Sequence, residues 1–169
     1  MLFRSIARSL KKTLRRGVYR VTLDTEFEKV VRACAAPREH NREGGTWITP
    51  QMIDAYCRLH DQGYAHSVEA WSGDELVGGL YGVALGGVFF GESMFSRQPD
   101  ASKVALVILA RQLAAWGYVQ IDCQLPSPHL ESLGATPIRR KDFLHLLDIA
   151  LAMPDRVGRW QLDANLKIV

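Results

Sequence analysis

Residues 75–116, ELVGGLYGVALGGVFFGESMFSRQPDASKVALVILARQLAAW, decide the fold of this chain. The stretch begins with an apolar run at 75–85, turns at Gly86-Gly87 and resumes with a second run at 88–93. Two such runs joined by a pair of glycines are the pattern of an antiparallel β-hairpin. The sequence therefore predicts two neighbouring strands, the second of which runs into the polar segment 91–97.

The remainder of this stretch predicts a long buried helix. Residues from Ala101 to Trp116 are mostly apolar, with Asp100 before them as a capping residue and Gly117 after them as a stop. A helix that is apolar on nearly every side belongs inside a fold rather than on its surface. The segment 118–123 follows the helix and predicts another buried strand.

The flanking sequence supplies the other elements of a mixed fold. Thr49-Pro50 is a strong helix start, because threonine caps the first turn and proline fits the first helical position. Asp24 and Thr25 are expected to cap another helix in the same way. We expect further strands at about 19–23 and 66–71, and further helices at about 3–16, 25–34, 50–62, 130–133 and 140–151. The order predicts the α+β class: a central, mostly antiparallel sheet flanked by helices, in one domain spanning residues 1–169.

The composition excludes several classes of protein. With 47% hydrophobic and 23% charged residues in a chain of 169, the makeup is that of an ordinary globular domain. No apolar run is long enough to span a bilayer, and the three cysteines form no CxxC pair. His60, His66 and His129 lack metal-ligand spacing and are expected to be structural. We therefore expect no membrane association, disulfide framework or metal, and a cytoplasmic location.

The net charge of +3 hides a basic leading segment. Residues 1–20 contain no acid, so the remainder of the chain is acidic overall. The basic residues are Arg4, Arg8, Lys11, Lys12, Arg15, Arg16 and Arg20. Such a segment on a mildly acidic globule favours docking of a polyanion, RNA or DNA before a membrane. The alternative interpretation is a solvated helix face.

Two acids stand where buried strands should be apolar. Glu92 interrupts a run of apolar and small residues, and Asp122 lies inside the strand predicted at 118–123, two residues before Gln124. A carboxylate in such a place is costly unless it is paired or hydrogen-bonded, and burial raises its pKa. An acid held in that way can handle protons. The alternative interpretation is that Glu92 faces solvent or pairs with Arg97.

The order of elements is similar to the acyl-CoA N-acyltransferase (GNAT-like) fold, which acetyltransferases share with peptidyl-bridge-forming aminoacyl transferases. An acetyltransferase of this fold holds the coenzyme A pyrophosphate in a glycine-rich turn at the start of the long helix. Here that place, Arg97–Lys103, contains no glycine. Pro99 removes a backbone donor and Asp100 adds a repulsive charge. We therefore expect neither coenzyme A nor any other cofactor.

Longer motifs run through most of the chain in a fixed order. They are GTWI at 45–48, AYCRLH at 55–60, GYAHSVE at 63–69, ELVGGLYGV at 75–83, GESMFSR at 91–97, ASK at 101–103, IDCQ at 121–124, His129 with SLGA at 132–135, and RRKDF at 139–143. In these motifs the chain resembles the leucyl/phenylalanyl-tRNA–protein transferases of bacteria. The resemblance extends from about residue 4 to the final predicted helix.

The resemblance implies an activity and a set of catalytic residues. Members of the family transfer leucine, phenylalanine or sometimes methionine from tRNA to the N-terminal Arg or Lys of a protein, which marks that protein for degradation in an N-degron pathway. Gln124 is then expected to engage the attacking α-amino group, with Asp122 supporting it. Glu92 is expected to orient the reacting groups through hydrogen bonds. Because the tRNA ester is already activated, positioning the amine and removing its proton is sufficient chemistry.

The resemblance also implies where the substrates bind. Trp47 is expected to stack on the terminal adenosine, as flat rings do with single-stranded bases, although a core indole is the alternative. Met94, Phe95 and Ser96 are expected to line or back the pocket for the transferred side chain, with a packing role as the alternative. The residues expected to bind tRNA are Arg8, Lys11, Lys12, Arg15 and Arg16.

One departure from the family concerns the start of the chain. Typical members carry a further small domain before the position that matches Phe3, and this sequence begins there with its own Met. It is therefore read as a natural short form or a cut piece, and the loop at 38–44 is read as longer than usual. Three functions stay open: a transferase acting on protein N-termini, a relative that uses aminoacyl-tRNA to build a small amide or dipeptide, and a non-catalytic tRNA-binding module.

Overall fold

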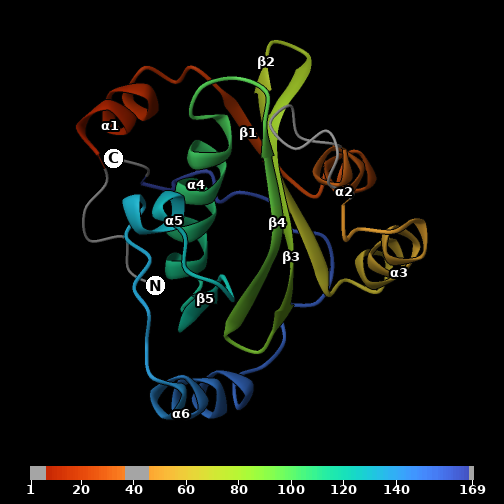
Figure 1. Cartoon of the computed structure of the whole chain (residues 1–169), viewed down its shortest axis with the longest axis vertical. Helices are drawn as coiled ribbons and strands as arrows, with labels where there is room; N and C mark the ends of the chain where they lie inside the picture. The colour runs from red at the N-terminus through yellow and green to blue at the C-terminus, as the bar shows by residue number, and fades with distance from the viewer. Residues whose placement is uncertain (1–6, 37–45, 168–169) are drawn as a thin grey trace.

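The computed structural model describes residues 7–36 and 46–167, and it is an α+β fold around one five-stranded sheet (Figure 1). The strands lie in chain order, β1-β2-β3-β4-β5. They are β1 (Arg20–Leu23), β2 (Ala65–Ser72), β3 (Glu75–Leu85), β4 (Val88–Ser96) and β5 (Gln120–Asp122). The helices are α1 (Arg8–Arg15), α2 (Phe27–Ala35), α3 (Pro50–Asp61), α4 (Ala101–Ala115), α5 (Pro128–Ser132) and α6 (Arg140–Leu151).

The predicted hairpin is confirmed and forms the centre of the sheet. β3 pairs antiparallel with β4 from Leu85↔Val88 to Gly78↔Ser96, with a register shift after Tyr81. The first four strands are all antiparallel to their neighbours, and β5 alone pairs in parallel, with β4. A parallel pair requires a crossover connection, and α4 supplies it. The prediction of a mostly antiparallel sheet is therefore confirmed.

Helices cover both faces of the sheet (Figure 1). On one face lies α4, with eleven of its fifteen residues buried, and α1 packs beside it through Leu10. On the other face lie α2 and α3, whose Val30, Val31 and Ile53 form a second apolar cluster with residues of the sheet. The sheet thus separates two cores, which is the usual way to bury both of its surfaces.

The last described segment returns to the core without regular structure. After α6 the chain passes the turn between β3 and β4, where Asp155 accepts the backbone N–H of Gly86 at 2.6 Å, and it brings Trp160, which is 3% exposed, into the cluster on the α4 side. The Trp160 ring stacks on His66, with 3.5 Å between ring centroids. Asp163 fixes the same segment to α4, because Gln112 Nε2 donates to its carboxylate at 2.8 Å and its backbone N–H donates back to Gln112 Oε1 at 2.8 Å.

Helix boundaries follow the predicted signals with two corrections. Thr49 caps α3 as expected and accepts a hydrogen bond from the backbone N–H of Met52 at 3.3 Å. The prediction that Asp24 caps α2 was wrong, because α2 begins at Phe27 without a side-chain cap and the Asp24 carboxylate points into the core. Asp100 precedes α4 as predicted, but its carboxylate binds Lys103 Nζ at 2.9 Å instead of capping the helix.

The remaining differences are small. The strand expected at 118–123 is shorter, Gln120–Asp122, and the short helix expected at 130–133 begins earlier, at Pro128, with Ser127 as its cap. The predicted start of the first helix, about residue 3, and the loop at 38–44 lie outside the described residues. In the described part of the chain, none of the helices combines the length and apolarity needed to cross a membrane.

Candidate active site in the cleft beside β4

A cleft of about 920 Å³ opens where β4 and β5 separate. Pairing between them covers only Val88 to Phe90 of β4, after which β4 continues alone on that side to Ser96. The walls come from β4, α2, α4, α5 and the segments beside them. Its lining residues include Cys34, Trp47, Phe89, Glu92, Met94, Phe95, Ser96, Arg97, Ile121, Gln124 and His129.

β5 turns away from β4 for a local reason. Gln124 has a φ of +56°, a left-handed conformation that is uncommon for a residue other than glycine. Asp122 Oδ1 accepts the backbone N–H of Gln124 at 2.9 Å and so holds this turn. Gln124 lines the cleft, whereas Asp122 is not part of the lining. The expectation that Asp122 supports Gln124 thus has a specific contact.

Glu92 faces helix α3 across the cleft wall. Its Oε2 accepts a hydrogen bond from the hydroxyl of Tyr56 at 2.8 Å, and no ion pair joins it to Arg97 among the described residues. The alternative prediction of a Glu92–Arg97 pair was therefore wrong. Burial raises the pKa of Tyr56, and the hydrogen bond to Glu92 raises it further, so Tyr56 stays a proton donor to the carboxylate.

A second tyrosine stands behind this pair. Tyr81 of β3 is fully buried, and its ring meets that of Tyr56 edge-on at 5.0 Å. Burial first, and then the neighbouring Tyr56, Cys34 and Glu92, raise the pKa of the Tyr81 hydroxyl. In the sequence Tyr56 is part of the motif at 55–60 and carries no role of its own. A hydroxyl on an otherwise apolar helix face is the sequence signal that Tyr56 offers, and it does not by itself point to Glu92.

The residues expected to bind substrate all line the same cleft. Trp47 is 52% exposed, so the alternative prediction of a core indole was wrong. Met94 and Phe95 are half-buried on opposite faces of β4, and Phe95 lies under the guanidinium of Arg97, 5.5 Å from the ring centroid. The hydroxyl of Ser96 is already engaged, since it donates to the carbonyl of Gln98 at 2.8 Å.

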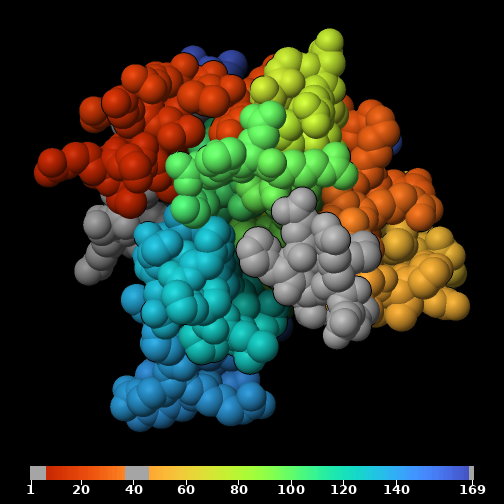
Figure 2. All heavy atoms as spheres, turned by 45° about the horizontal axis from the view of Figure 1, so that its top comes forward, coloured from red at the N-terminus to blue at the C-terminus, as the bar shows by residue number. Residues whose placement is uncertain are grey.

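The basic residues of α1 form a separate surface. All five side chains expected to bind tRNA are exposed, and none makes an ion pair with another described residue; they are Arg8, Lys11, Lys12, Arg15 and Arg16. Figure 2 shows α1 on the same face of the molecule as the segment around α5, with the residues before α4 between them. The segment after α1 is also bound to the residues before α4, because the hydroxyl of Tyr19 donates to the carbonyl of Pro99 at 2.7 Å.

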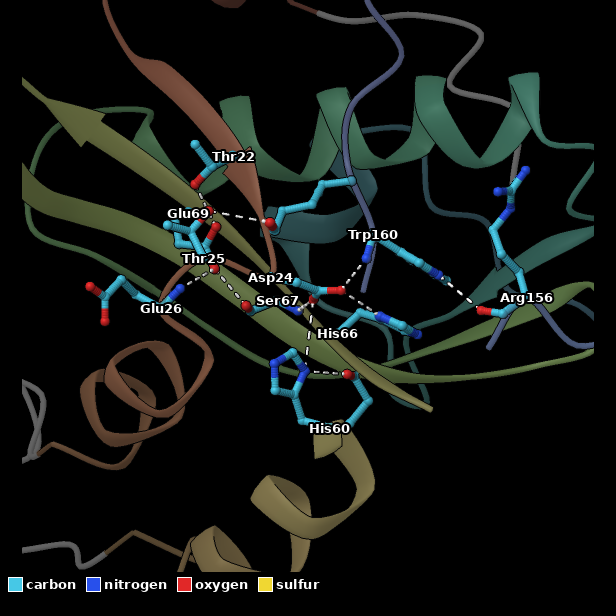
Figure 3. A network of polar contacts seen from close by, with 12 residues as sticks. Thr22, Asp24, Thr25, Glu26, His60, His66, Ser67, Glu69, Arg156 and Trp160 are labelled. Carbon is cyan, nitrogen blue, oxygen red and sulfur yellow. Dashed lines mark hydrogen bonds and ion pairs between the residues drawn. The ribbon is translucent and has the colours of Figure 1, made fainter. Parts of the chain in front are cut away.

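The histidines differ from one another. His66 Nδ1 lies 2.8 Å from Asp24 Oδ2 in the buried network of Figure 3, and His60 Nδ1 lies 2.8 Å from the carbonyl of Ala65, so both have structural partners as predicted. His129 lines the cleft instead, where burial and the nearby Lys103 lower its pKa. Among residues 7–36 and 46–167, no three His, Cys, Asp or Glu side chains gather closely enough to hold a metal.

Fold and cleft together define the class of this protein. It is an α+β protein whose sheet opens into a cleft beside a long helix. The cleft is lined by a hydrogen-bonded carboxylate, Glu92, and by Gln124, whose backbone N–H is bound by Asp122. Comparison with known proteins gives the family. A model of the leucyl/phenylalanyl-tRNA protein transferase family matches residues 3–148, and the chain belongs to this family.

Individual relatives agree along nearly the whole chain. Proteins named leucyl/phenylalanyl-tRNA–protein transferase from Thiobacillus denitrificans and Anaeromyxobacter are 55% and 57% identical to it, over 94% and 95% of its length. One from Legionella pneumophila is 54% identical over 94% of the chain. The matched regions cover 69%, 68% and 70% of these relatives, so each is longer than this chain.

Proposed function

We propose that this protein is an aminoacyltransferase that forms a peptide bond between an amino acid carried by tRNA and the α-amino group of an acceptor protein with an N-terminal Arg or Lys. The observation that carries the proposal is the pairing of family membership with a cleft that Glu92 and Gln124 both line. The relatives' name supplies the substrates: leucine or phenylalanine on tRNA, and a protein. Such transfer marks the acceptor for degradation and takes place in the cytoplasm, where charged tRNA is found.

The chemistry asks little of the protein. The acceptor nitrogen attacks the ester carbonyl carbon, a C–N bond forms, the ester C–O bond breaks, and the tRNA ribose hydroxyl leaves with a proton from the amine. The ester is activated, so orientation of the two substrates and removal of that proton are the steps to be assisted. In our proposal Gln124 holds the attacking amine and Asp122 fixes Gln124 through its backbone N–H.

In the same proposal Glu92 orders the reacting atoms through hydrogen bonds. One oxygen of its carboxylate is held by Tyr56, which leaves the other free to accept from the amine or from the ribose hydroxyl. A neutral donor leaves the carboxylate its full negative charge, which an ion pair with Arg97 would have balanced. Tyr56 is thus a positioning residue in this proposal.

The other contacts divide between the two ends of the aminoacyl-tRNA. Trp47 is exposed enough to stack on the terminal base, and Met94, Phe95 and Ser96 lie along the cleft where the transferred side chain would enter. The exposed cations of α1 supply the electrostatic attraction for the tRNA phosphates. We further propose that residues 1–169 form one GNAT-like domain, because a parallel β5 reached through α4 and a splayed β4 match that plan.

A coenzyme A thioester is the weaker candidate as acyl donor. The start of α4 has no glycine turn, and the Asp100 carboxylate lies there, bound to Lys103. The negative charge opposes a pyrophosphate at that helix end.

The test is an assay of product formation from radiolabelled aminoacyl-tRNAs, with a peptide beginning with Arg and, separately, small amines as acceptors. We expect tRNA-dependent product that Gln124→Ala and Glu92→Ala each reduce about a hundredfold or more. Replacing Lys11, Lys12, Arg15 and Arg16 by Ala should weaken tRNA binding and flatten its salt dependence. Undiminished turnover in both cleft variants would contradict the site, and product with small amines alone would favour the biosynthetic alternative. No product with any charged tRNA would favour a non-catalytic tRNA-binding module.

A further inference from the structure

The cleft wall contains a length of β-strand with no neighbour on one side. β3 pairs with β4 as far as Ser96, but β5 pairs with it only as far as Phe90. From Gly91 to Ser96 the backbone of β4 therefore faces the cleft without a strand partner in the described part of the chain, and all of these residues line the cleft. An unpaired strand edge is a template for another extended chain.

The register identifies which backbone groups are open. Arg97 donates its N–H to the carbonyl of Val77 at 2.7 Å, so Arg97 and Val77 form a hydrogen-bonded pair. Bonded and non-bonded pairs alternate along an antiparallel ladder, which places Leu80↔Met94 among the non-bonded pairs. The N–H and C=O of Met94 therefore point away from β3, toward the cleft. They lie two residues from Glu92 along the strand.

We propose that the extended backbone of the acceptor protein pairs with β4 at Met94 as an added strand, which guides its terminal amine to Glu92 and Gln124. The inference rests on the proposed function and names the recognition element for its acceptor. A peptide fits this edge because its N–H and C=O groups alternate at the same spacing, whereas the phosphates and sugars of an RNA strand offer no matching series of N–H donors. From Glu92 to Ser96 the strand spans about 13 Å, which is enough for the first few acceptor residues.

Such pairing makes a prediction that pocket binding of a single N-terminal residue does not. Successive residues of a strand point their backbone groups to alternate sides, so only every second acceptor amide can bond to β4. Of the second and third peptide amides, only one should then be sensitive to N-methylation. Methylation at that amide should raise the KM for the peptide about five- to tenfold, the effect of one lost hydrogen bond, and methylation at the other should not. Methylation of an amide far along the peptide serves as the matched control and should have no effect.

The experiment measures initial rates with the 169-residue chain, one aminoacyl-tRNA and a set of Arg-initiated peptides methylated at a single amide, together with arginine amide. We expect a higher KM for arginine amide than for the peptide and an alternating penalty along the methylated set. Equal KM values for all methylated peptides, or for arginine amide and the peptide, would overturn the strand proposal while leaving the transferase intact. Absence of product with every acceptor would instead overturn the proposed function.

A pair of variants tests the same bond from the protein side. Met94→Ala and Met94→Pro both remove the side chain, but only proline removes the N–H, and the group lost is one that β3 does not use. We expect the KM for the peptide to be higher in the proline variant than in the alanine variant. The KM for aminoacyl-tRNA should be the same in these two variants. Equal peptide KM values in the two folded variants would contradict the proposal, and the methylated peptides decide the matter if the proline variant does not fold.

Discussion

Two glutamates on the same sheet have opposite surroundings. Glu69 of β2 is fully buried, and its oxygens accept hydrogen bonds from the hydroxyls of Thr22 at 2.6 Å and Ser67 at 2.5 Å and from the backbone N–H of Glu26 at 3.4 Å. Glu92 of β4 is only half-buried, borders the cleft and, among the described residues, accepts a single hydrogen bond, from Tyr56. The first carboxylate is saturated by the protein, and the second has acceptor capacity left for a substrate.

The same contrast separates two aspartates. Asp24, shown in Figure 3, accepts from the backbone N–H groups of Ser67 at 2.9 Å and Trp160 at 2.6 Å and has His66 within 2.8 Å. Asp122 accepts one backbone N–H among the described residues, that of Gln124, which borders the cleft. A saturated acid contributes to folding, because its partners lose their bonds if it is removed, whereas an unsaturated acid in a cleft is available for chemistry.

The largest expected effect is on the saturated side. Asp24→Ala removes the acceptor of two buried backbone N–H groups and the partner of His66, and it should lower the free energy of unfolding by about 3–5 kcal/mol. Denaturant unfolding followed by fluorescence measures the change. We expect the last described segment to loosen first, since Trp160 is held there.

Asp122→Ala is the matched control for this variant. It removes one hydrogen bond near the surface, so its cost in stability should be below about 1 kcal/mol, while transferase activity falls because Gln124 is no longer held. Equal losses of stability in the two aspartate variants would show that the division into saturated and unsaturated acids is wrong.

A smaller effect is expected from loosening the cleft without removing its acid. Tyr56→Phe deletes the hydroxyl that holds Glu92, and it should lower kcat about tenfold with little change in stability. Tyr118→Phe is the control: burial raises the pKa of Tyr118 to about 12, and its hydroxyl has no hydrogen-bond partner among the described residues. An unchanged kcat in Tyr56→Phe, or an equal fall in both variants, would contradict the positioning role.

The contrast also explains what the sequence could and could not predict. Local signals worked where the partner lies close in the chain, as with the Thr49 cap and the glycine turn between β3 and β4. Asp24 has the same kind of local signal, but its partners are 42 and 136 residues away, and these long-range bonds prevail over a cap. Tertiary context overrides local propensity in such cases.

The cleft itself was only partly predictable. Glu92 and Asp122 could be singled out because each is an acid in a strand predicted to be buried, and the resemblance to a family added Gln124 and the roles expected of all three. Tyr56 could not, since a tyrosine on the apolar face of a helix is ordinary until its hydroxyl is seen 2.8 Å from Glu92. The open edge of β4 depends on the length of β5, and strand ends are the least reliable feature of a sequence pattern.

The smallest expected effect concerns the pH dependence of stability and distinguishes Glu69 from a surface acid. Burial raises the pKa of Glu69 in the folded state, although hydrogen bonds from Ser67 and Thr22 oppose that rise. The folded protein therefore holds the proton of the Glu69 carboxyl more tightly than the unfolded chain does. The resulting contribution to the free energy of unfolding is fully present at a pH below the ordinary glutamate pKa of about 4.3. It is lost as the pH rises through the raised folded pKa.

Glu69→Gln cannot ionise, so it escapes this loss. The variant forfeits acceptor capacity at every pH, but its free energy of unfolding relative to the original protein should improve as the pH rises from 4 toward neutrality, and then level off. Urea unfolding at several pH values measures the difference. Glu28→Gln, which alters an exposed glutamate paired with Arg32, controls for the loss of a carboxylate. A difference in free energy of unfolding between Glu69→Gln and the original protein that is constant with pH would contradict this expectation. That result would mean that the hydrogen bonds fully offset the effect of burial, so that Glu69 is no harder to ionise than an acid on the surface.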